Sequence, residues 1–594
     1  MVTLATTAIQ GGTMDSPANA AVPETTRPRR NVRPWALLVL GVLVSLGISY
    51  AAYTLAGYSW SQVVDYKSPF TSMPTDTFTG KRPPLSIAVP DATPRRVVLV
   101  LIDGLTDAAS RTMPSINALR KRGNDVALTV PQPSLSYPTW TTILTGAPPN
   151  VSGVTTNWYE KRVAVESLFD VAAGSGRSLV VAGPTDLDTL FGVSTVATAT
   201  ALTDWPEGGY ITNTIVDDAI RLADENSADF VFALFPDVDE AGHSAGAAST
   251  EYADVVAKVD ADLARLIGAL DDGDTVFVVL PDHGHIATGG HGGWEDTVIH
   301  TSATFAGPGV KSGTSAVLLQ DVAPTIAVLA GLQAPQYAAG LASDAILADT
   351  NGRSKDADFV RAIGFDLAYA RTLNGQDAIK DIASLASAAD LTKVTADAEA
   401  ARLKADRADR LPMALGLALA ALAILAVIGV ASWRALVAAL AGSATYFAVY
   451  NALFFLVHHF AWSLSAFNEE SHVQAFFNGR MIEAVIAGLI GCLVAGDIYL
   501  LFRPEAKGTR DGFTAGWLSL GAATALAIQA LLGLQVAWFL WQWGAQTVWR
   551  LPDLRWGFKY DLDLIQMTAL AGVALLGPVL TYLIGRFHPR MVKS

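Results

Sequence analysis

Cysteine is almost absent from this 594-residue sequence, because Cys492 is the only one. No disulfide can form within the chain, and a cysteine-rich metal site is excluded. Charged residues are also scarce, at 16%, whereas 51% of the residues are hydrophobic. This composition is too apolar for a purely soluble protein and indicates membrane spans. The formal net charge of −14 argues against a nucleic-acid-binding protein, so no nucleic-acid polymer is expected as a partner.

The first apolar segment runs from Trp35 to about Tyr58 and follows a polar stretch that ends in several arginines. We predict a disordered cytoplasmic tail over residues 1–34 and a transmembrane anchor over 35–58. A cleaved signal peptide is the alternative. It is disfavoured because the apolar run is long and a long tail precedes it. Residues 59–94 are expected to be a linker.

Five further apolar segments lie near the C-terminus, and each is long enough to span a bilayer. They cover about 411–432, 435–457, 481–502, 513–540 and 564–585. With the anchor they give six spans and place the intervening basic residues on the cytoplasmic side: Arg434, Arg503, Lys507, Arg510, Arg586, Arg590 and Lys593. The sequence therefore predicts a multi-pass cell-membrane protein with both termini cytoplasmic and residues 60–410 outside.

The region between the membrane segments has the pattern of an α/β domain. Short apolar runs are expected to be buried strands at Val97–Ile102, Ser178–Ala182, Asp229–Phe235 and Thr275–Leu280. Helical stretches such as Thr250–Leu270 lie between them. This alternation predicts a mainly parallel sheet with helices on both faces over residues 95–345. A helical linker, 346–410, and a five-span transmembrane domain, 411–594, are expected to follow.

Polar residues gather just beyond the predicted strands. Asp103, Asp239 and Asp282 all come directly or soon after such a strand, where ligands bind in open α/β sheets. Five of the nine histidines lie between His243 and His300. Aspartate and histidine together are ligands for zinc or a similar divalent ion. The alternative for Asp103 is a turn-forming Asp-Gly pair. The alternative for Asp239 is an acidic surface loop.

Asp282 and His283 are adjacent and end the last predicted strand. Adjacent side chains on an extended segment point in opposite directions, so one residue could serve each of two ions. His291 lies in a glycine-rich loop, where the backbone can approach a ligand closely. We expect His283 and His291 to lie in exposed loops. Ser136 precedes a helix-like stretch, and a hydroxyl there benefits from the positive end of the helix dipole. Plain helix capping by this serine is the alternative.

Together these segments resemble the alkaline phosphatase superfamily, and in particular its type I phosphodiesterase and nucleotide pyrophosphatase branch. The resemblance rests on 101–104 (LIDG), 136–139 (SYPT) with 145–149 (TGAPP), 239–243 (DEAGH), 281–284 (PDHG) and 290–292 (GHG). It implies two divalent metal ions, with zinc expected, and a nucleophile at Ser136. It further implies one ion held by Asp239, His243 and His291, and a second held by Asp103, Asp282 and His283, with Ser136 bridging towards it.

The sequence departs from the branch at two positions. Ser136 stands where threonine is usual, and Thr139 replaces an asparagine that holds phosphoryl oxygens; Thr139 and Asn157 are taken as substrate-binding residues. Trp140 stands where a sulfatase needs arginine, which argues against a formylglycine sulfatase. The membrane segments are similar, in general plan, to ethanolamine phosphate transferases that modify lipid-linked glycans.

The resemblance implies an extracytoplasmic, membrane-anchored phosphodiesterase or phosphohydrolase with a covalent seryl-phosphate intermediate. Its substrate would be a phosphodiester or a phospholipid-type molecule, and a membrane lipid is an expected partner. The alternatives are a phosphoethanolamine-type transferase and a lipid-handling or transport protein with an inactive external domain. Tryptophan and basic residues in the outer loops, including Trp543 and Arg550, are typical of an interfacial belt. A headgroup site for an anionic lipid is the other interpretation.

Overall fold

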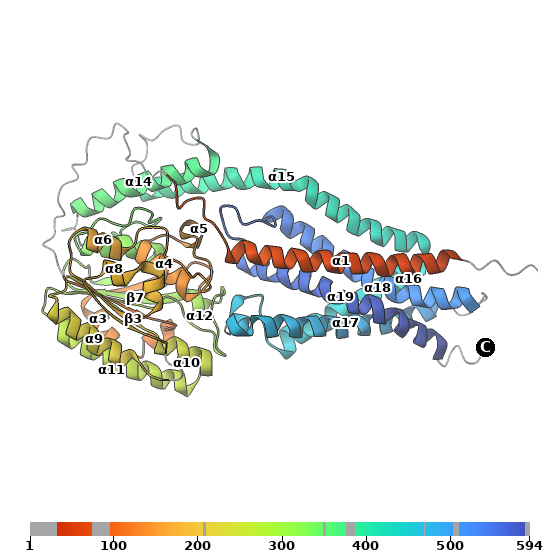
Figure 1. Ribbon diagram of the computed structural model, residues 1–594, viewed down its shortest axis with the longest axis horizontal. Coiled ribbons are helices and arrows are strands. Elements are labelled where there is room, and N and C mark those ends of the chain that lie inside the picture. Colours follow the sequence, from red (N-terminus) through yellow and green to blue (C-terminus); the bar gives the residue numbers. More distant parts are fainter. Residues whose placement is uncertain are drawn as a thin grey trace, which may run out of the picture.

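The computed structural model describes residues 32–73, 96–205, 209–348, 352–375, 387–468, 470–502 and 510–587. Most of the predicted tail 1–34 and of the predicted linker 59–94 lies outside the described residues, and so do Arg503, Lys507, Arg590 and Lys593. An α/β domain forms one end of the molecule and a bundle of long helices forms the other (Figure 1).

The α/β domain is built around an eight-stranded sheet with the strand order β4-β3-β5-β1-β6-β7-β2-β8. Among the described strands, only β7 runs antiparallel to its neighbours. The strands are β1 Val97–Ile102, β2 Asn124–Thr129, β3 Leu179–Pro184, β4 Ala199–Thr203, β5 Phe230–Phe235, β6 Val276–Leu280, β7 His300–Ala306 and β8 Gly313–Leu318. The predicted mainly parallel sheet is confirmed.

Helices cover both faces of the sheet, because alternate residues of its central strands point to opposite sides. Leu99 of β1 packs on one face with α4, α6 and α13, and Val98 packs on the other face with α3, α9 and α11. The helices of this domain are α2 Asp107–Ser110, α3 Pro114–Arg122, α4 Ser136–Thr145, α5 Pro149–Ser152, α6 Leu168–Gly174, α7 Asp186–Phe191, α8 Val193–Val196, α9 Thr212–Glu225, α10 Asp237–Ala245, α11 Thr250–Leu270, α12 Asp296–Ile299, η1 Leu319–Asp321 and α13 Val322–Leu329.

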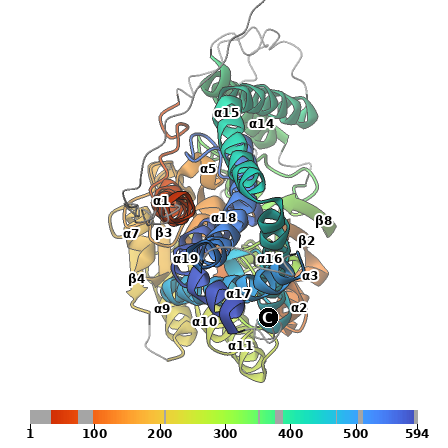
Figure 2. The same cartoon turned by 90° about the vertical axis from the view of Figure 1, so that its right-hand side faces the viewer.

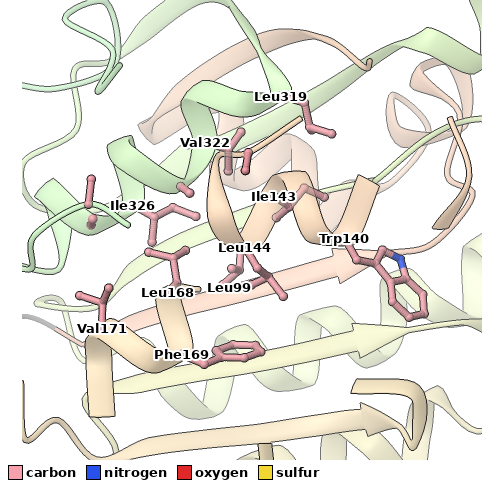
Figure 3. Close-up of a cluster of buried hydrophobic side chains, with 14 of the residues drawn as sticks. Leu99, Trp140, Ile143, Leu144, Leu168, Phe169, Val171, Leu319, Val322 and Ile326 are labelled. Atoms are coloured by element: carbon pink, nitrogen blue, oxygen red, sulfur yellow. The ribbon is translucent and has the colours of Figure 1, made fainter. Parts of the chain in front are cut away.

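Helix α4 is held firmly between the sheet and α13. Ile143 and Leu144 lie between Leu99 of the sheet and the apolar side chains of α13 (Figure 3). These side chains are fully buried. The packing matters for function, because α4 begins at Ser136 and a rigid helix fixes the position of its first residue.

Among the described residues, six helices are long and apolar enough to cross a membrane. One is α1 and five are C-terminal, as predicted. The helices outside the α/β domain are α1 Val32–Val64, α14 Gly352–Asn374, α15 Ala388–Ala431, α16 Trp433–Asn451, η3 Ala452–Val457, η4 Leu464–Phe467, η5 Glu470–His472, α17 Val473–Phe502, α18 Arg510–Gln542 and α19 Leu554–Phe587.

The apolar helices pack into one bundle, which Figure 2 shows from its end. Buried polar side chains join helices that are far apart in sequence. The Ser45 hydroxyl of α1 donates to Gln529 Oε1 of α18 at 2.8 Å, and the Tyr446 hydroxyl of α16 donates to Gln566 Oε1 of α19 at 2.7 Å. Such bonds favour one arrangement of helices where water is scarce. The N-terminal helix is thus part of the bundle.

Helix α15 differs from the expectation of a separate linker followed by a span. It is one continuous helix of 44 residues that passes from the polar stretch into the apolar one. Its polar half packs on α14 beside the α/β domain, and its apolar half joins the bundle (Figure 1). Helix propensity in the alanine-rich polar stretch lets the helix continue through the change of composition.

Candidate active site

Three neighbouring strands bring the three predicted aspartates together. The central strand order β5-β1-β6 places the carboxyl ends of these strands side by side. Asp103 follows β1 directly, Asp282 lies two residues beyond β6, and Asp239 is in the first turn of α10, which follows β5. All three side chains are buried. The sequence prediction that strand ends would carry the site agrees with this placement.

The first group of candidate ligands, which we call the inner cluster, consists of Asp103, Asp282 and His283. Their ligand atoms lie within 4.8 Å of one another, and all three residues are inaccessible to solvent. His283 Nε2 is 3.4 Å from Asp103 Oδ1 and 3.3 Å from Asp282 Oδ2. The Ser136 hydroxyl lies 3.4 Å from His283 Nε2, at the N-terminus of α4. The structure therefore places Ser136 beside this cluster.

Asp282 is oriented by four hydrogen bonds, one of them from the Thr139 hydroxyl to Oδ2 at 3.3 Å. Its Oδ1 accepts from the backbone amides of Gly104, at 3.1 Å, and His283, at 2.8 Å. Its Oδ2 accepts from Trp140 Nε1 at 2.9 Å. Trp140 therefore has a structural use at the position where a sulfatase would carry arginine. Donors of this kind fix a carboxylate ligand and tune its interaction with a metal.

The second group, the outer cluster, consists of Asp239, His243 and His291. Helical spacing puts Asp239 and His243 on the same face of α10, with His243 Nε2 at 3.2 Å from Asp239 Oδ2. The glycine-rich loop brings His291 Nε2 to 3.1 Å from His243 Nε2 and 3.7 Å from Asp239 Oδ1. The three predicted ligands of the first ion are thus within contact of one another.

His285 also belongs to this site, although sequence analysis did not select it. Its Nε2 lies 2.6 Å from Asp239 Oδ1, and its ligand atom groups with those of Asp239, His283 and His291 within 4.8 Å. Burial lowers the pKa of His285, which keeps the ring neutral and able to act as a ligand. The clustering of histidines after Asp282 was the available signal for this residue.

The prediction that His283 and His291 lie in exposed loops is wrong. Both side chains are buried, His283 completely. Loops at strand ends are commonly exposed, but here α4 and the helical bundle cover these. Burial lowers the pKa of His291 well below its usual range.

Asp103 provides the clearest test of whether a cation fits the inner cluster. Neither of its carboxylate oxygens has a hydrogen-bond partner among the described residues, and both are buried. Burial and the neighbouring carboxylates of Asp282 and Asp239 raise the pKa of Asp103 well above its usual range. Buried polar atoms without a partner are costly. A divalent cation would satisfy them, so the donor set fits a metal ion.

The two predicted substrate-binding residues have different surroundings. Asn157 lines a cavity next to the outer cluster, and its Oδ1 accepts from the backbone amide of Tyr137 at 3.0 Å. Thr139 is fully buried, with its hydroxyl 2.7 Å from the Leu135 carbonyl and 3.3 Å from Asp282 Oδ2. The Thr139 hydroxyl is thus hydrogen-bonded to the helix backbone and to Asp282. The substrate role of both residues stays a prediction.

The cavity, of about 370 Å³, is lined by both halves of the molecule. The α/β domain contributes His243 and His291 of the outer cluster. The bundle contributes several aromatic side chains and also the charged residues Arg550 and Asp561. Asp561 Oδ1 is buried and has no hydrogen-bond partner among the described residues. Trp543 and Arg550, noted in the sequence as members of an outer-loop group, both line this cavity.

Comparison with known proteins adds to this picture. Residues 97–185 and 196–307 match the family model of type I phosphodiesterase / nucleotide pyrophosphatase. The catalytic subunit of GPI ethanolamine phosphate transferase 3 from Mus musculus is 27% identical over 271 residues, which is 40% of this chain and 24% of the mouse protein. The Homo sapiens protein is 27% identical over 202 residues, 32% of this chain and 18% of its own length. The chain thus spans about a quarter or less of these relatives.

Solved structures similar to the chain include a murine ectonucleotide pyrophosphatase / phosphodiesterase 5, in an inactive form with AMP. It has a TM-score of 0.36 and 13% identity, and the match covers 44% of this chain and 99% of that one. Wild-type alkaline phosphatase PafA has a TM-score of 0.37 and 13% identity, and the match covers 43% of this chain and 100% of that one. The family model confirms the likeness, expected from the motifs, to type I phosphodiesterases and nucleotide pyrophosphatases, and the matched α/β domain lies beside a bundle of membrane-type helices.

Proposed function

We propose that the chain is a membrane-anchored, metal-dependent phosphodiesterase or phosphohydrolase with Ser136 as its nucleophile. The observation that supports this most is the position of the Ser136 hydroxyl. It lies at the start of a rigid helix, 3.4 Å from His283 Nε2, beside two clusters of buried aspartate and histidine. A hydroxyl placed in this way beside candidate metal ligands suits attack on phosphorus.

In this proposal the inner cluster holds one divalent ion and the outer cluster holds the other, with zinc as the first candidate. When bound, the ions supply positive charge that stabilises a developing oxyanion and offsets the negative charge of a phosphoryl group. Ser136 Oγ forms the new bond to phosphorus as the leaving group departs, which gives a seryl-phosphate. Water or another alcohol then releases the phosphoryl group and restores the serine. Helix α4 holds Ser136 in place, and its N-terminus favours negative charge there.

A panel of three model substrates tests the proposal on the purified full-length chain. We expect hydrolysis of bis(4-nitrophenyl) phosphate to exceed that of 4-nitrophenyl phosphate, with no turnover of 4-nitrophenyl sulfate. A chelator should stop the reaction, and Zn²⁺ should restore it. Ser194→Ala, which alters an exposed serine of α8, is the control for Ser136→Ala. Preference for the sulfate ester, or full turnover in Ser136→Ala, would contradict the proposal.

The cavity favours a second candidate, a phosphoethanolamine-type transferase. The relatives named above are GPI ethanolamine phosphate transferases. The cavity joins the outer cluster to aromatic residues of the bundle, and the unpaired Asp561 oxygen would suit a positively charged group such as an amine. An inactive external domain is less well supported, because every expected ligand is present and in contact with its group.

Products distinguish hydrolase from transferase. The full-length chain would be placed in vesicles of phosphatidylethanolamine with and without an added alkyl mannoside as acceptor. Free ethanolamine phosphate, unchanged by the acceptor, would indicate a hydrolase. Ethanolamine phosphate attached to the mannoside would indicate a transferase. Asp561→Asn should raise the KM for this lipid and leave hydrolysis of bis(4-nitrophenyl) phosphate nearly unchanged.

The proposed orientation places the active site outside the cytoplasm and both termini inside. The positive-inside pattern of the sequence supports it. Cysteines introduced as Gly352→Cys and Ser594→Cys, in a Cys492→Ala background, test it with an impermeant thiol reagent. In intact cells we expect labelling at position 352 and none at 594. The reverse pattern would overturn the orientation.

A further inference from the structure

The outer cluster has a neighbour from the helical bundle. We call residues 463–468, which precede α17, the docking segment. Asn468 at its end makes two contacts with His243: its Nδ2 donates to the His243 carbonyl at 2.9 Å, and its Oδ1 lies 3.4 Å from His243 Nδ1. On the other side of the ring, His243 Nε2 faces Asp239 and His291. Asn468 therefore contacts Nδ1 of His243, whereas Nε2 of the same ring faces the other candidate ligands of the outer cluster.

The chemistry of this contact favours one form of the imidazole. An amide oxygen accepts a hydrogen bond, so Asn468 Oδ1 favours the form of His243 with its proton on Nδ1. That form leaves the Nε2 lone pair free to bind a cation. A partner of this kind on the second nitrogen orients a histidine ligand and raises its basicity. The bond from Nδ2 to the His243 carbonyl holds the two residues in register.

The backbone at Asn468 supports a specific role for its side chain. Its φ is +62° and its ψ is −51°, a conformation that costs energy for any residue other than glycine. Such strain persists where the surroundings maintain it. Here the surroundings are the hydrogen bonds to His243 and the close packing of the docking segment on the loop that carries His291.

That loop fits against the docking segment because it consists largely of glycine. A Cβ atom on Gly290 would lie 2.3 Å from the Ser465 carbonyl oxygen, and one on Gly289 would lie 2.8 Å from Asn468 Oδ1. The Ser465 hydroxyl accepts from the Gly293 amide at 3.2 Å and donates to Glu295 Oε2 at 2.8 Å. The glycines thus allow the bundle to approach the outer cluster.

We propose that Asn468 is a positioning residue through which the membrane bundle sets the metal affinity of the outer cluster. The inference rests on the proposed function, because it takes His243 as a ligand. The bundle would then be part of the metal centre as well as an anchor. Asn468 contacts His243 of the outer cluster, whereas Ser136 and Trp140 contact the inner cluster, so the metal affinity of the inner cluster should not depend on Asn468.

Metal retention by the full-length chain tests this inference. Zinc would be removed by titration with a chelator and counted by elemental analysis, with thermal unfolding as a check of folding. Asn468→Gly removes the side chain and relieves the backbone. We expect one of two metals to be held about 10- to 100-fold more weakly in this variant. Cobalt substituted for zinc should show a changed absorption spectrum. Asn468→Asp, which keeps the acceptor oxygen, should restore most of the affinity.

Asn478→Ala, which alters an exposed asparagine of α17, is the matched control and should hold both metals as the wild type does. Asn468→Ser, whose side chain is too short to reach His243 Nδ1, replaces the glycine variant if that one does not fold. If Asn468→Gly or Asn468→Ser holds both metals as tightly as the wild type does, the inference is overturned. The proposed function would still stand in that case. A wild-type chain without tightly held metal would contradict both.

Discussion

The inner and outer clusters use the same kinds of residue but are supported differently. Asp103, Asp282 and His283 are held by the ends of β1 and β6, by α4 and by donors such as Trp140. Asp239, His243 and His291 are held partly by the α/β domain and partly by the docking segment of the bundle. The comparison shows that one domain can build one cluster of candidate ligands alone and share the support of a second cluster with the helical bundle.

The largest expected effect concerns the serine beside the inner cluster. Ser136→Ala should lower turnover of bis(4-nitrophenyl) phosphate on the order of 10³-fold or more, because the nucleophile is removed. Both clusters keep their ligands, so elemental analysis should find the metal content of the wild type. Full activity in this variant, with loss in Thr139→Ala, would reverse the assignment of the nucleophile.

The next prediction separates the clusters by their ligands. His291→Ala should lower bound metal from about two ions per chain to about one, because it removes a ligand of the outer cluster alone. His283→Ala should do the same at the inner cluster. It should also lower the midpoint of thermal unfolding, because His283 is completely buried. Elemental analysis and calorimetry measure the two effects, and unchanged metal content in both variants would contradict the ligand assignment.

A third prediction tests the contact between the glycine loop and the docking segment. Gly290→Ala places a methyl group against the Ser465 carbonyl and should weaken the outer metal site about 10-fold while sparing the inner one. Gly273→Ala is the matched control. Its φ of +89° is close to the +99° of Gly290, but no atom lies within 4 Å of its Cβ position. If both variants hold metal equally well, the docking contact has no part in the metal centre.

An effect of similar size is expected at Trp140. Trp140→Phe keeps an aromatic ring in the core but removes the hydrogen bond to Asp282 Oδ2. We expect the inner metal to be held about 10-fold more weakly, since the carboxylate loses one of its orienting donors. The free energy of unfolding should fall by about 1 kcal/mol. Chelator titration and denaturant unfolding measure these changes, and weakening of the outer metal alone would contradict the assignment.

The sequence predicted the centre of the fold better than its edges. Strand β1 and helix α11 occur with the predicted bounds, because buried strands and amphipathic helices have clear patterns. Strands β2, β4, β7 and β8 were not predicted. Strands β4 and β8 form the two edges of the sheet, and both are partly exposed along their length. Polar residues at such edges hide the usual apolar run.

The same difference applies to the site. Aspartates that follow strands can be placed from sequence, because strand ends converge at one edge of a parallel sheet. Asn468 carried no such signal, since it comes 225 residues after His243 and reaches it only through the packing of the bundle. Trp140 was noted as a departure from a motif, yet its hydrogen bond to Asp282 could be seen only in three dimensions.

The most direct test of the account is a chelator titration of the purified full-length chain, with bound metal and turnover of bis(4-nitrophenyl) phosphate measured at each step. We expect about two divalent ions per chain and loss of turnover as they are removed, with recovery on adding Zn²⁺. Full turnover by a chain that holds less than about one ion would contradict it.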